Sequence, residues 1–381
     1  MKAHMKLARR LMLAALAIMA MAPAAMSETR APYPQRPDVQ QFIDELTIQH
    51  GFERQRVERW LSQARYSPAV ERYMQPPIAF GQRNWLDYRA RYLDEARVQA
   101  GAAFVRNHQM AMERAQREFG VPAEIIAAII GVETYYGRIT GNFRTLDALV
   151  TLSFDYMRRA DYYRQQLTEF LLLMREQNTD PLTIKGSFAG AVGLPQFMPG
   201  SIRRHAVDFD GDGRVDLGNS PADAIGSVAS FLAAHGWQRD TPIVFEVVAD
   251  EAIVDALGRG INAAVTWSDA LAAGVEGDLP LPLDAQVLVI DLPIVDGGDA
   301  KRLYRVGTVN FSALLHYNRS YFYASAVVIC RARSRKPSSA RQWRPAAPPA
   351  APPRTPAAAC SYRISASRSA THPGCNPFAE R

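Results

Sequence analysis

Apolar residues at helical spacing fill the first third of the chain, and they constrain the fold more than any other feature of the sequence. Between residues 38 and 119 they recur three or four positions apart, as in Phe42, Ile43 and Leu46. Residues at this spacing share one face of an α-helix, and that face can pack against a core. We therefore predict a series of packed helices that forms an N-terminal helical domain over residues 28–120.

The middle of the chain continues the helical pattern. Pro122 suits the first position of a helix and Glu124 lies near the positive end of its dipole, so a helix is predicted over residues 122–133. Further helical patterns cover residues 144–177 and 221–235. These segments predict a mainly α-helical protein.

Residues 241–305 differ, because short β-prone runs alternate there with glycine, proline and aspartate. One such run, Gln-Val-Leu-Val-Ile, occupies residues 286–290. We predict a small β-containing domain inserted between helical parts, followed by a last helical stretch over residues 311–328. The fold class is therefore mainly α, of the α+β type.

The N-terminal segment has the order of features of an export signal. Basic residues come first, an apolar run from Leu11 to Ala22 follows, and small residues end the segment near Ser27. A helix that spans a bilayer needs about 20 apolar residues, more than this run contains, so no stable membrane anchor is expected. We predict a signal peptide over residues 1–27 and a periplasmic protein.

The three cysteines, Cys330, Cys360 and Cys375, all lie far from this apolar run. No cysteine is therefore placed where a lipid would be attached after signal cleavage. The body of the chain also lacks a disulfide framework, so side-chain packing must hold it together. We expect the exported product to be a monomer.

The composition changes abruptly at Arg331 to arginine, serine, alanine and proline, without apolar periodicity. Such a segment buries too little surface to fold, which predicts a disordered tail over residues 331–381. A shifted reading frame would produce the same change, and the sequence alone leaves both explanations open. The tail and the signal carry formal charges of +9 and +4, which leaves −7 on residues 28–330. An acidic body without a basic stripe argues against nucleic-acid binding.

Glu133 ends the predicted helix over residues 122–133. At helical spacing it shares a face with Ile126, Ile129 and Ile130. A carboxyl group held against apolar neighbours has a raised pKa, which suits a general acid near neutral pH. A surface glutamate at a frayed helix end fits the same spacing, so helix geometry alone leaves both interpretations open.

Two neighbouring segments are typical of a sugar-binding site. Tyr135 and Tyr136 follow the acid, and aromatic faces pack against the apolar faces of pyranose rings. A glycine-rich loop over residues 186–199 offers the polar side chains of Ser187 and Gln196. Core packing accounts equally well for isolated tyrosines, and a glycine-rich loop by itself is weak evidence.

Taken together and in order, these motifs resemble the lytic murein transglycosylase B family. The motifs are Gly131-Val132-Glu133-Thr134, Gly186-Ser187-Phe188-Ala189-Gly190-Ala191 and Gln196-Phe197-Met198-Pro199, within a similarity from about Trp85 to Tyr323. The resemblance implies a lysozyme-like catalytic core over residues 121–240 and 306–330. It also implies a flanking helical domain and the inserted β-containing domain over residues 241–305.

The family's chemistry implies that Glu133 protonates the glycosidic oxygen between N-acetylmuramic acid and N-acetylglucosamine in peptidoglycan strands. The same carboxylate then takes a proton from the C6 hydroxyl of the muramoyl unit, which closes to a 1,6-anhydro ring without water. Most glycosidases need two carboxylates, and the motifs around Glu133 and Gln196 contain no second acid. The alternatives are a hydrolytic muramidase, a glycan-binding protein without activity and, less favoured, a calcium sensor.

The resemblance also assigns substrate-binding residues. They are Tyr88, Ser187, Gln196, Tyr317, Asn318 and Tyr323, with Arg158 and Arg159 as contacts to an anionic peptide or lactyl group. Surface ion pairing is the alternative role for the two arginines. Phe231 occupies a cleft position that is usually tyrosine in the family, which keeps a stacking face but loses a hydrogen bond.

An acidic loop resembles the start of an EF-hand. Asp208, Asp210 and Asp212 occupy positions 1, 3 and 5, glycine occupies position 6 and Arg214 position 7. Position 12 is asparagine instead of glutamate, and the family resemblance implies a longer loop, over residues 208–223, that Asp223 closes. The chain has one residue more here than the family spacing. We predict structural calcium in this loop, with a solvated acidic turn as the alternative.

Overall fold

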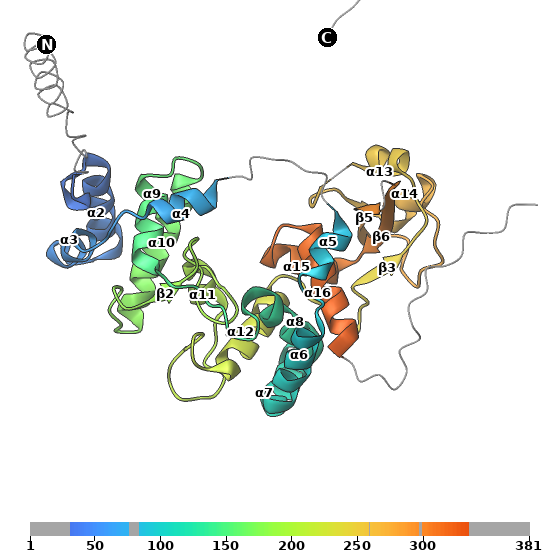
Figure 1. Ribbon diagram of the computed structural model, residues 1–381, viewed down its shortest axis with the longest axis horizontal. Coiled ribbons are helices and arrows are strands. Elements are labelled where there is room, and N and C mark those ends of the chain that lie inside the picture. Colours follow the sequence, from blue (N-terminus) through green and yellow to red (C-terminus); the bar gives the residue numbers. More distant parts are fainter. Residues whose placement is uncertain (1–30, 76–83, 259, 297–298, 335–381) are drawn as a thin grey trace, which may run out of the picture. The chain divides into compact units, whose positions relative to one another are not determined.

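A computed structural model describes residues 31–75, 84–258, 260–296 and 299–334 (Figure 1). The predicted signal peptide over residues 1–27 and the predicted tail beyond residue 334 lie outside these ranges. Within the described ranges, no helix combines the length and the apolar character that crossing a bilayer requires.

The first helices pack on two helices from the middle of the chain. They are η2 (Tyr33–Gln35), α2 (Pro37–His50), α3 (Arg54–Ser62) and α4 (Pro68–Met74), and their partners are α9 (Thr145–Phe154) and α10 (Ala160–Glu176). Asp155 joins the two groups, because it accepts hydrogen bonds from the Tyr33 hydroxyl at 2.6 Å and from Arg36 at 2.7 Å. The Phe42 and Phe154 rings pack edge to face between them.

A second group of helices surrounds α8 (Ala123–Thr134). It comprises α6 (Glu95–Asn107), α7 (Gln109–Phe119), α12 (Pro221–Ala234) and α16 (Tyr321–Ser334), and α5 (Trp85–Ala90) packs on α16. The sequence predicted one apolar face for α8, but every residue from Ile125 to Gly131 is buried. A helix that is apolar all round occupies the centre of a bundle, so the end of α8 brings Glu133 among other helices.

Two sequence predictions for the C-terminal part are wrong in detail. The expected single helix over residues 311–328 is divided into α15 (Val309–Tyr317) and α16, because Asn318 adopts an extended backbone and the Ser320 hydroxyl accepts from the Tyr323 N–H. The predicted boundary at Arg331 lies inside α16, which runs to Ser334. The apolar pattern of α16 fades before the helix itself ends.

The β-prone region forms a four-stranded antiparallel sheet in the order β3-β6-β5-β4. Its strands are β3 (Val244–Glu246), β4 (Ala264–Thr266), β5 (Gln286–Asp296) and β6 (Asp299–Gly307), with α13 (Glu251–Leu257) and α14 (Trp267–Ala272) between them. Val254, Trp267 and Val306 contribute to a small core of its own. Since β6 pairs with β5 as far as Gly307, the insertion ends two residues beyond the predicted boundary at 305.

Two short segments support the glycine-rich loop. Strand β1 (Phe143–Arg144) pairs with β2 (Lys185–Gly186), which leads directly into Ser187. Helix α11 (Pro199–His205) begins where the loop ends and packs on α10 and α12. Both ends of the loop are therefore held by regular structure.

Candidate active site

Glu133 lies in the last turn of α8, half-buried, and faces the start of α16. The Tyr323 hydroxyl donates a hydrogen bond of 2.7 Å to Glu133 Oε1. Burial raises the pKa of Glu133 to about 7, while the hydrogen bond from Tyr323 acts in the opposite direction. A large fraction of Glu133 therefore carries a proton near neutral pH, as a general acid requires.

The surroundings of Glu133 contain no acidic partner in the described part of the chain. Burial and the Tyr323 hydroxyl account for the shift of its pKa, and no second carboxylate contributes. A pair of nearby carboxylates would raise the pKa of one of them by charge repulsion. Within the residues that the structure describes, no second carboxylate therefore perturbs the pKa of Glu133.

Three of the predicted substrate-binding tyrosines gather near Glu133. The Tyr317 and Tyr323 rings stack with centroids 6.2 Å apart and planes within 12°, and the Tyr317 hydroxyl donates to the Pro195 carbonyl at 2.6 Å. Burial, followed by the charge of Glu133, raises the pKa of both hydroxyls well above the usual range. Burial also raises the pKa of Tyr88, with smaller contributions from Tyr92 and then Glu133. All three hydroxyls stay neutral and can donate hydrogen bonds.

The chain turns sharply after Glu133. Tyr135 and Tyr136 have φ angles of 51° and 59°, a left-handed conformation that costs free energy for residues other than glycine. Thr134 holds this turn, because its hydroxyl donates to the Leu194 carbonyl at 2.8 Å and accepts from the Gly137 N–H. This contact ties the end of α8 to the glycine-rich loop.

Arg97 of α6 is a second support that the sequence did not reveal. It donates to the Gly131 carbonyl at 2.8 Å, and its guanidinium carbon lies 4.5 Å from the centroid of the Tyr135 ring. Arg138 lies 4.6 Å from the same centroid. A cation over an aromatic face is attractive, so the two arginines hold the strained tyrosine turn. No local sequence signal connects Arg97 to α8.

The glycine-rich loop fixes both of its polar side chains. Gln196 Nε2 donates to the carbonyls of Thr140 and Gly193, at 3.1 and 2.9 Å, which leaves Oε1 as the acceptor of the amide. Ser187 Oγ accepts from the Ala191 N–H at 3.1 Å. Both side chains are thus oriented before any ligand binds.

Phe231 joins the aromatic group, since its ring centroid lies 5.0 Å from that of Tyr317. Asn318 is exposed and follows Tyr317 directly. Arg158 and Arg159 are exposed at the start of α10, and the Arg159 guanidinium lies 4.3 Å from the Tyr162 ring centroid. Arg159 packs on Tyr162 and Tyr163 and not on the residues around Glu133, so a substrate role for the two arginines stays a prediction.

Three of the five predicted calcium ligands converge in the acidic loop. Carboxylate oxygens of Asp208, Asp210 and Asp212 lie within 4.8 Å of one another. The two oxygens of Asp208 accept from the N–H groups of Gly211 and Gly213, which have φ angles of 80° and 88°. This set of hard oxygen donors fits calcium.

Asp223, the residue predicted to close the metal site, makes hydrogen bonds within the loop. It is buried, and its two carboxylate oxygens accept from the N–H groups of Phe209 and Asp216, both at 2.7 Å. Asp223 therefore joins the two sides of the loop and is not among the converging carboxylates. The Arg214 N–H donates to Asp212 Oδ1 at 2.9 Å, which places this predicted ligand at the same turn.

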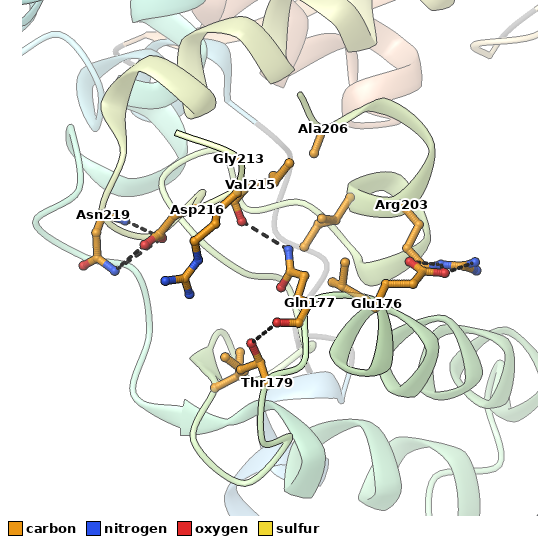
Figure 2. Close-up of a pocket in the computed structure, with 13 residues that line it drawn as sticks. Glu176, Gln177, Thr179, Arg203, Ala206, Gly213, Val215, Asp216 and Asn219 are labelled. Carbon is orange, nitrogen blue, oxygen red and sulfur yellow. Dashed lines mark hydrogen bonds and ion pairs between the residues drawn. The ribbon is translucent and has the colours of Figure 1, made fainter. Parts of the chain in front are cut away.

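A cavity of about 520 Å³ lies beside the acidic loop, between it and the ends of α10 and α11 (Figure 2). Gln177 crosses it and donates to the Val215 carbonyl at 3.1 Å, while Arg203 pairs with Glu176 at 2.7 Å. Its lining includes neither Glu133 nor the tyrosines near it. The cavity therefore lies among residues that pack beside the acidic loop, and it is separate from Glu133 and the tyrosines near it.

The hydrogen bond between Tyr323 and Glu133 should affect how the activity depends on pH. Activity that needs protonated Glu133 is present below pH 7 and is lost as the pH rises through the pKa of about 7. Tyr323→Phe removes an interaction that lowers this pKa, so we expect the alkaline limb of kcat/KM, which reports the free enzyme, to move up by as much as about one pH unit. Tyr317→Phe is the control, because that hydroxyl binds Pro195. An unchanged limb in Tyr323→Phe would contradict the assignment.

Comparison with known proteins supports this geometry. Residues 34–331 match the transglycosylase SLT domain family. The membrane-bound lytic murein transglycosylase B of Escherichia coli is 41% identical over 299 residues, which cover 76% of this chain and 81% of the relative.

Solved structures of related enzymes have the same fold. The soluble lytic transglycosylase SltB1 of Pseudomonas aeruginosa is 41% identical and has a TM-score of 0.72, with 78% of this chain and 98% of that chain covered. The E. coli lytic transglycosylase Slt35 in complex with calcium is also 41% identical, with a TM-score of 0.70 and coverage of 79% and 94%. These similarities confirm the predicted mainly α, lysozyme-like fold. The chain therefore belongs to the transglycosylase SLT domain family and is a lytic transglycosylase of the B type, as its sequence motifs predict.

Proposed function

We propose that this enzyme cleaves the β-1,4 bond between N-acetylmuramic acid and N-acetylglucosamine in peptidoglycan without using water. The observation that carries the proposal is Glu133, a half-buried carboxyl group with a pKa of about 7 and no carboxylate partner among the described residues. Hydrolytic glycosidases generally use a second carboxylate as a nucleophile or as a base for water. A single acid suits a reaction in which the substrate supplies the attacking oxygen.

Glu133 acts twice in this mechanism. It first donates its proton to the glycosidic oxygen, and the bond from that oxygen to C1 of the muramoyl unit breaks as positive charge develops at C1. The C6 hydroxyl oxygen then forms a bond to C1 and gives its proton to the Glu133 carboxylate, which restores the acid. The Tyr323 hydroxyl, 2.7 Å from Oε1, stabilises the carboxylate between the two steps.

The surrounding side chains bind and orient the strand. The partly exposed rings of Tyr88 and Tyr317 offer faces and edges to pyranose rings, and the oriented side chains of Ser187 and Gln196 offer hydrogen bonds. Tyr323 and Phe231 are buried and pack against Tyr317, so we assign them to holding that ring in place. We assign Asn318, Arg158 and Arg159 to the outer parts of the strand, since all three are exposed. The signal-like pattern over residues 1–27 supports action in the periplasm, where peptidoglycan is located.

We also propose that Asp208, Asp210 and Asp212, with the Arg214 carbonyl, hold calcium in the acidic loop. The Slt35 structure, which is 41% identical, was solved in complex with calcium. A bound cation would offset the repulsion between the three carboxylates and stabilise the loop. It takes no part in the reaction, because these residues are separate from the group around Glu133.

Calcium binding predicts a measurable gain in stability. At a free calcium concentration about 100 times the Kd, the free energy of unfolding should rise by about 2.7 kcal/mol. The gain should disappear with a chelator and in Asp210→Asn, but persist in Asp161→Asn, whose side chain is fully exposed on α10. Thermal unfolding with and without calcium provides the measurement. An equal gain in wild type and Asp210→Asn would exclude this loop as the site.

Product analysis tests the proposed reaction. Purified peptidoglycan is digested with the wild-type enzyme and with Glu133→Gln, and the soluble products are identified by mass spectrometry. We expect 1,6-anhydromuramoyl ends from the wild type and almost no product from the variant. Reducing muramic acid ends would instead indicate a hydrolytic muramidase. Binding of glycan without any product would indicate a glycan-binding protein.

A further inference from the structure

Arg305 of β6 is a buried cation whose side chain makes no hydrogen bond to any described residue. It is only 8% exposed, and its ion-pair partner is Glu246 of β3, with Nη2 and Oε1 3.6 Å apart. That separation is too long for a hydrogen bond, and the Glu246 side chain is 66% exposed. A buried charge is costly unless a counter-ion and hydrogen bonds compensate it. The described part of the chain therefore leaves the guanidinium of Arg305 largely uncompensated.

The guanidinium group of Arg305 reaches the surface. Some buried polar atoms of the described residues are fully enclosed without a partner, and Arg97 Nε is one of them, but no nitrogen of Arg305 is. Since the nitrogens of Arg305 also lack hydrogen bonds, they must contact solvent. The small exposed part of this side chain therefore includes its N–H donors, and a ligand can reach them.

The sheet register shows which face of the sheet Arg305 occupies. Ile290 of β5 is its cross-strand partner, so the two side chains lie on the same face. Ile290 is buried in the main core together with Trp85 of α5, whereas Val289 and Val306 belong to the small core on the other face. Helix α5 packs on β5 (Figure 1). Arg305 therefore lies where the sheet meets the helices of the main core.

Arg89 is a second arginine at this junction. It lies on α5, is half-buried, and has no ion pair with a described residue. Burial lowers the pKa of Arg305, Glu246 raises it, and the positive charge of Arg89 lowers it again. Both guanidinium groups stay charged, because arginine does not lose its proton in proteins. Two cations that repel each other at a solvent-accessible place form a site suited to an anion.

We propose that Arg305 and Arg89 bind a carboxylate of the peptide stems that the glycan strand carries. This inference rests on the proposed function, since it takes peptidoglycan as the substrate. Guanidinium groups form paired, charge-assisted hydrogen bonds with carboxylates, and the bound anion would offset the repulsion between the two cations.

The proposed site continues from the candidate active site. Arg89 follows Tyr88 directly, and the Tyr88 ring packs on Phe322 of α16, with the two centroids 5.3 Å apart. The charge of Glu133 contributes to the raised pKa of Tyr88, after burial and Tyr92. A strand bound at Glu133 can therefore extend past Tyr88 and place a stem peptide at the two arginines.

The cost of burying Arg305 favours a role in binding over a role in folding. Apolar replacements of buried charged groups are often neutral or stabilising. Proteins keep such unfavourable features mainly where function requires them. The urea midpoint of Arg305→Met should therefore equal that of the wild type or exceed it, whereas loss of a structural arginine would lower the midpoint.

Kinetics with two forms of the substrate test the site. Fragment release from peptide-bearing strands is compared with release from strands whose stems an amidase has removed. On peptide-bearing strands we expect Arg305→Met to raise KM by about tenfold and to leave kcat within about twofold, because the arginine binds a stem and not the reacting bond. On stripped strands, wild type and variant should have equal KM values. Fragments are counted whatever their ends, so failure of the proposed ring closure would not change this result.

Variants of neighbouring arginines provide the controls. Arg302→Met changes the same strand, but Arg302 pairs with Glu251 at 2.9 Å and with Asp291, so its KM should match the wild type on both substrates. Arg305→Lys keeps the charge but cannot form paired hydrogen bonds, so its KM on peptide-bearing strands should be intermediate. Arg89→Gln should raise the same KM.

Three results would overturn the proposal. The first is an equal KM on peptide-bearing strands for wild type, Arg305→Met and Arg89→Gln. The second is a lower urea midpoint for Arg305→Met together with an unchanged KM for Arg305→Lys and Arg89→Gln, which would indicate a structural role. The third is binding of inorganic phosphate that Arg305→Met abolishes while KM is the same for both forms of the strand, which would assign the site to a different anion.

Discussion

Glu133→Gln is expected to lower kcat for glycan cleavage by about a thousandfold or more, because the residue serves as both acid and base. Glutamine has nearly the same shape and can still accept the hydrogen bond from Tyr323, so the site should keep its geometry. The amide cannot donate a proton to the glycosidic oxygen or take one from the C6 hydroxyl. Release of soluble fragments from purified sacculi gives the rate, and KM should change little.

Glu118→Gln provides the matched control. Glu118 lies on the neighbouring helix α7, where it is partly exposed and paired with Arg114 at 2.7 Å. Its loss should leave kcat within about twofold of wild type, since surface ion pairs contribute little. Comparable activity in Glu133→Gln and wild type would remove Glu133 from the mechanism.

Gly193→Ala is expected to destabilise the protein by about 3 kcal/mol or more, among the larger effects of a single substitution. Gly193 has a φ of 79°, which costs other residues about 1–2 kcal/mol. An added Cβ would also lie 2.5 Å from the Leu217 carbonyl oxygen, which already accepts from the Leu194 N–H at 2.8 Å. The chain there would have to move, and Gln196, which donates to the Gly193 carbonyl, would move with it. Both urea unfolding and kcat/KM should report the change.

Gly51→Ala distinguishes the cost of the left-handed backbone from the cost of a close contact by the added Cβ. Gly51 ends α2 with a φ of 65°, but an added Cβ there meets no atom within 4 Å. This variant should therefore lose only the backbone contribution of about 1 kcal/mol and keep its activity. Equal losses of stability in the two variants would show that the close approach of Gly193 and Leu217 has no energetic effect.

The sequence predicted elements well where local signals agree. The expected helix over residues 221–235 appears as Pro221–Ala234, with proline at its first turn and the Ser220 hydroxyl as its cap. Strand β6 was not predicted, because Asp299–Gly307 mixes charged with apolar residues and gains its structure from pairing with β5. The break at Asn318 was also missed, since apolar runs typical of a helix lie on both sides of it, over residues 311–315 and 322–328.

The residues of the candidate site were likewise predicted only in part. The apolar face of its helix left two interpretations of Glu133 open, and the ordered motifs decided between them and also indicated Tyr317 and Tyr323. The structure places these three residues together. Arg97 was not found, because its contact with Gly131 joins residues that are far apart in sequence. The hydrogen bonds of Asp223 were not predicted, because spacing alone does not show which way a carboxylate turns, and its role as a calcium ligand stays a prediction.

The origin of the oxygen bonded to C1 at the cleaved end shows whether water or the substrate's own C6 hydroxyl attacks. Peptidoglycan is digested by the wild-type enzyme in water enriched in oxygen-18, and the products are separated and weighed by mass spectrometry. We expect muramoyl ends that are lighter by one water than hydrolysed ends and that contain no oxygen-18, because the C6 oxygen of the substrate closes the ring. Muramoyl ends that carry oxygen-18 at C1 would show that water attacks, and would contradict a mechanism in which Glu133 works without a second carboxylate.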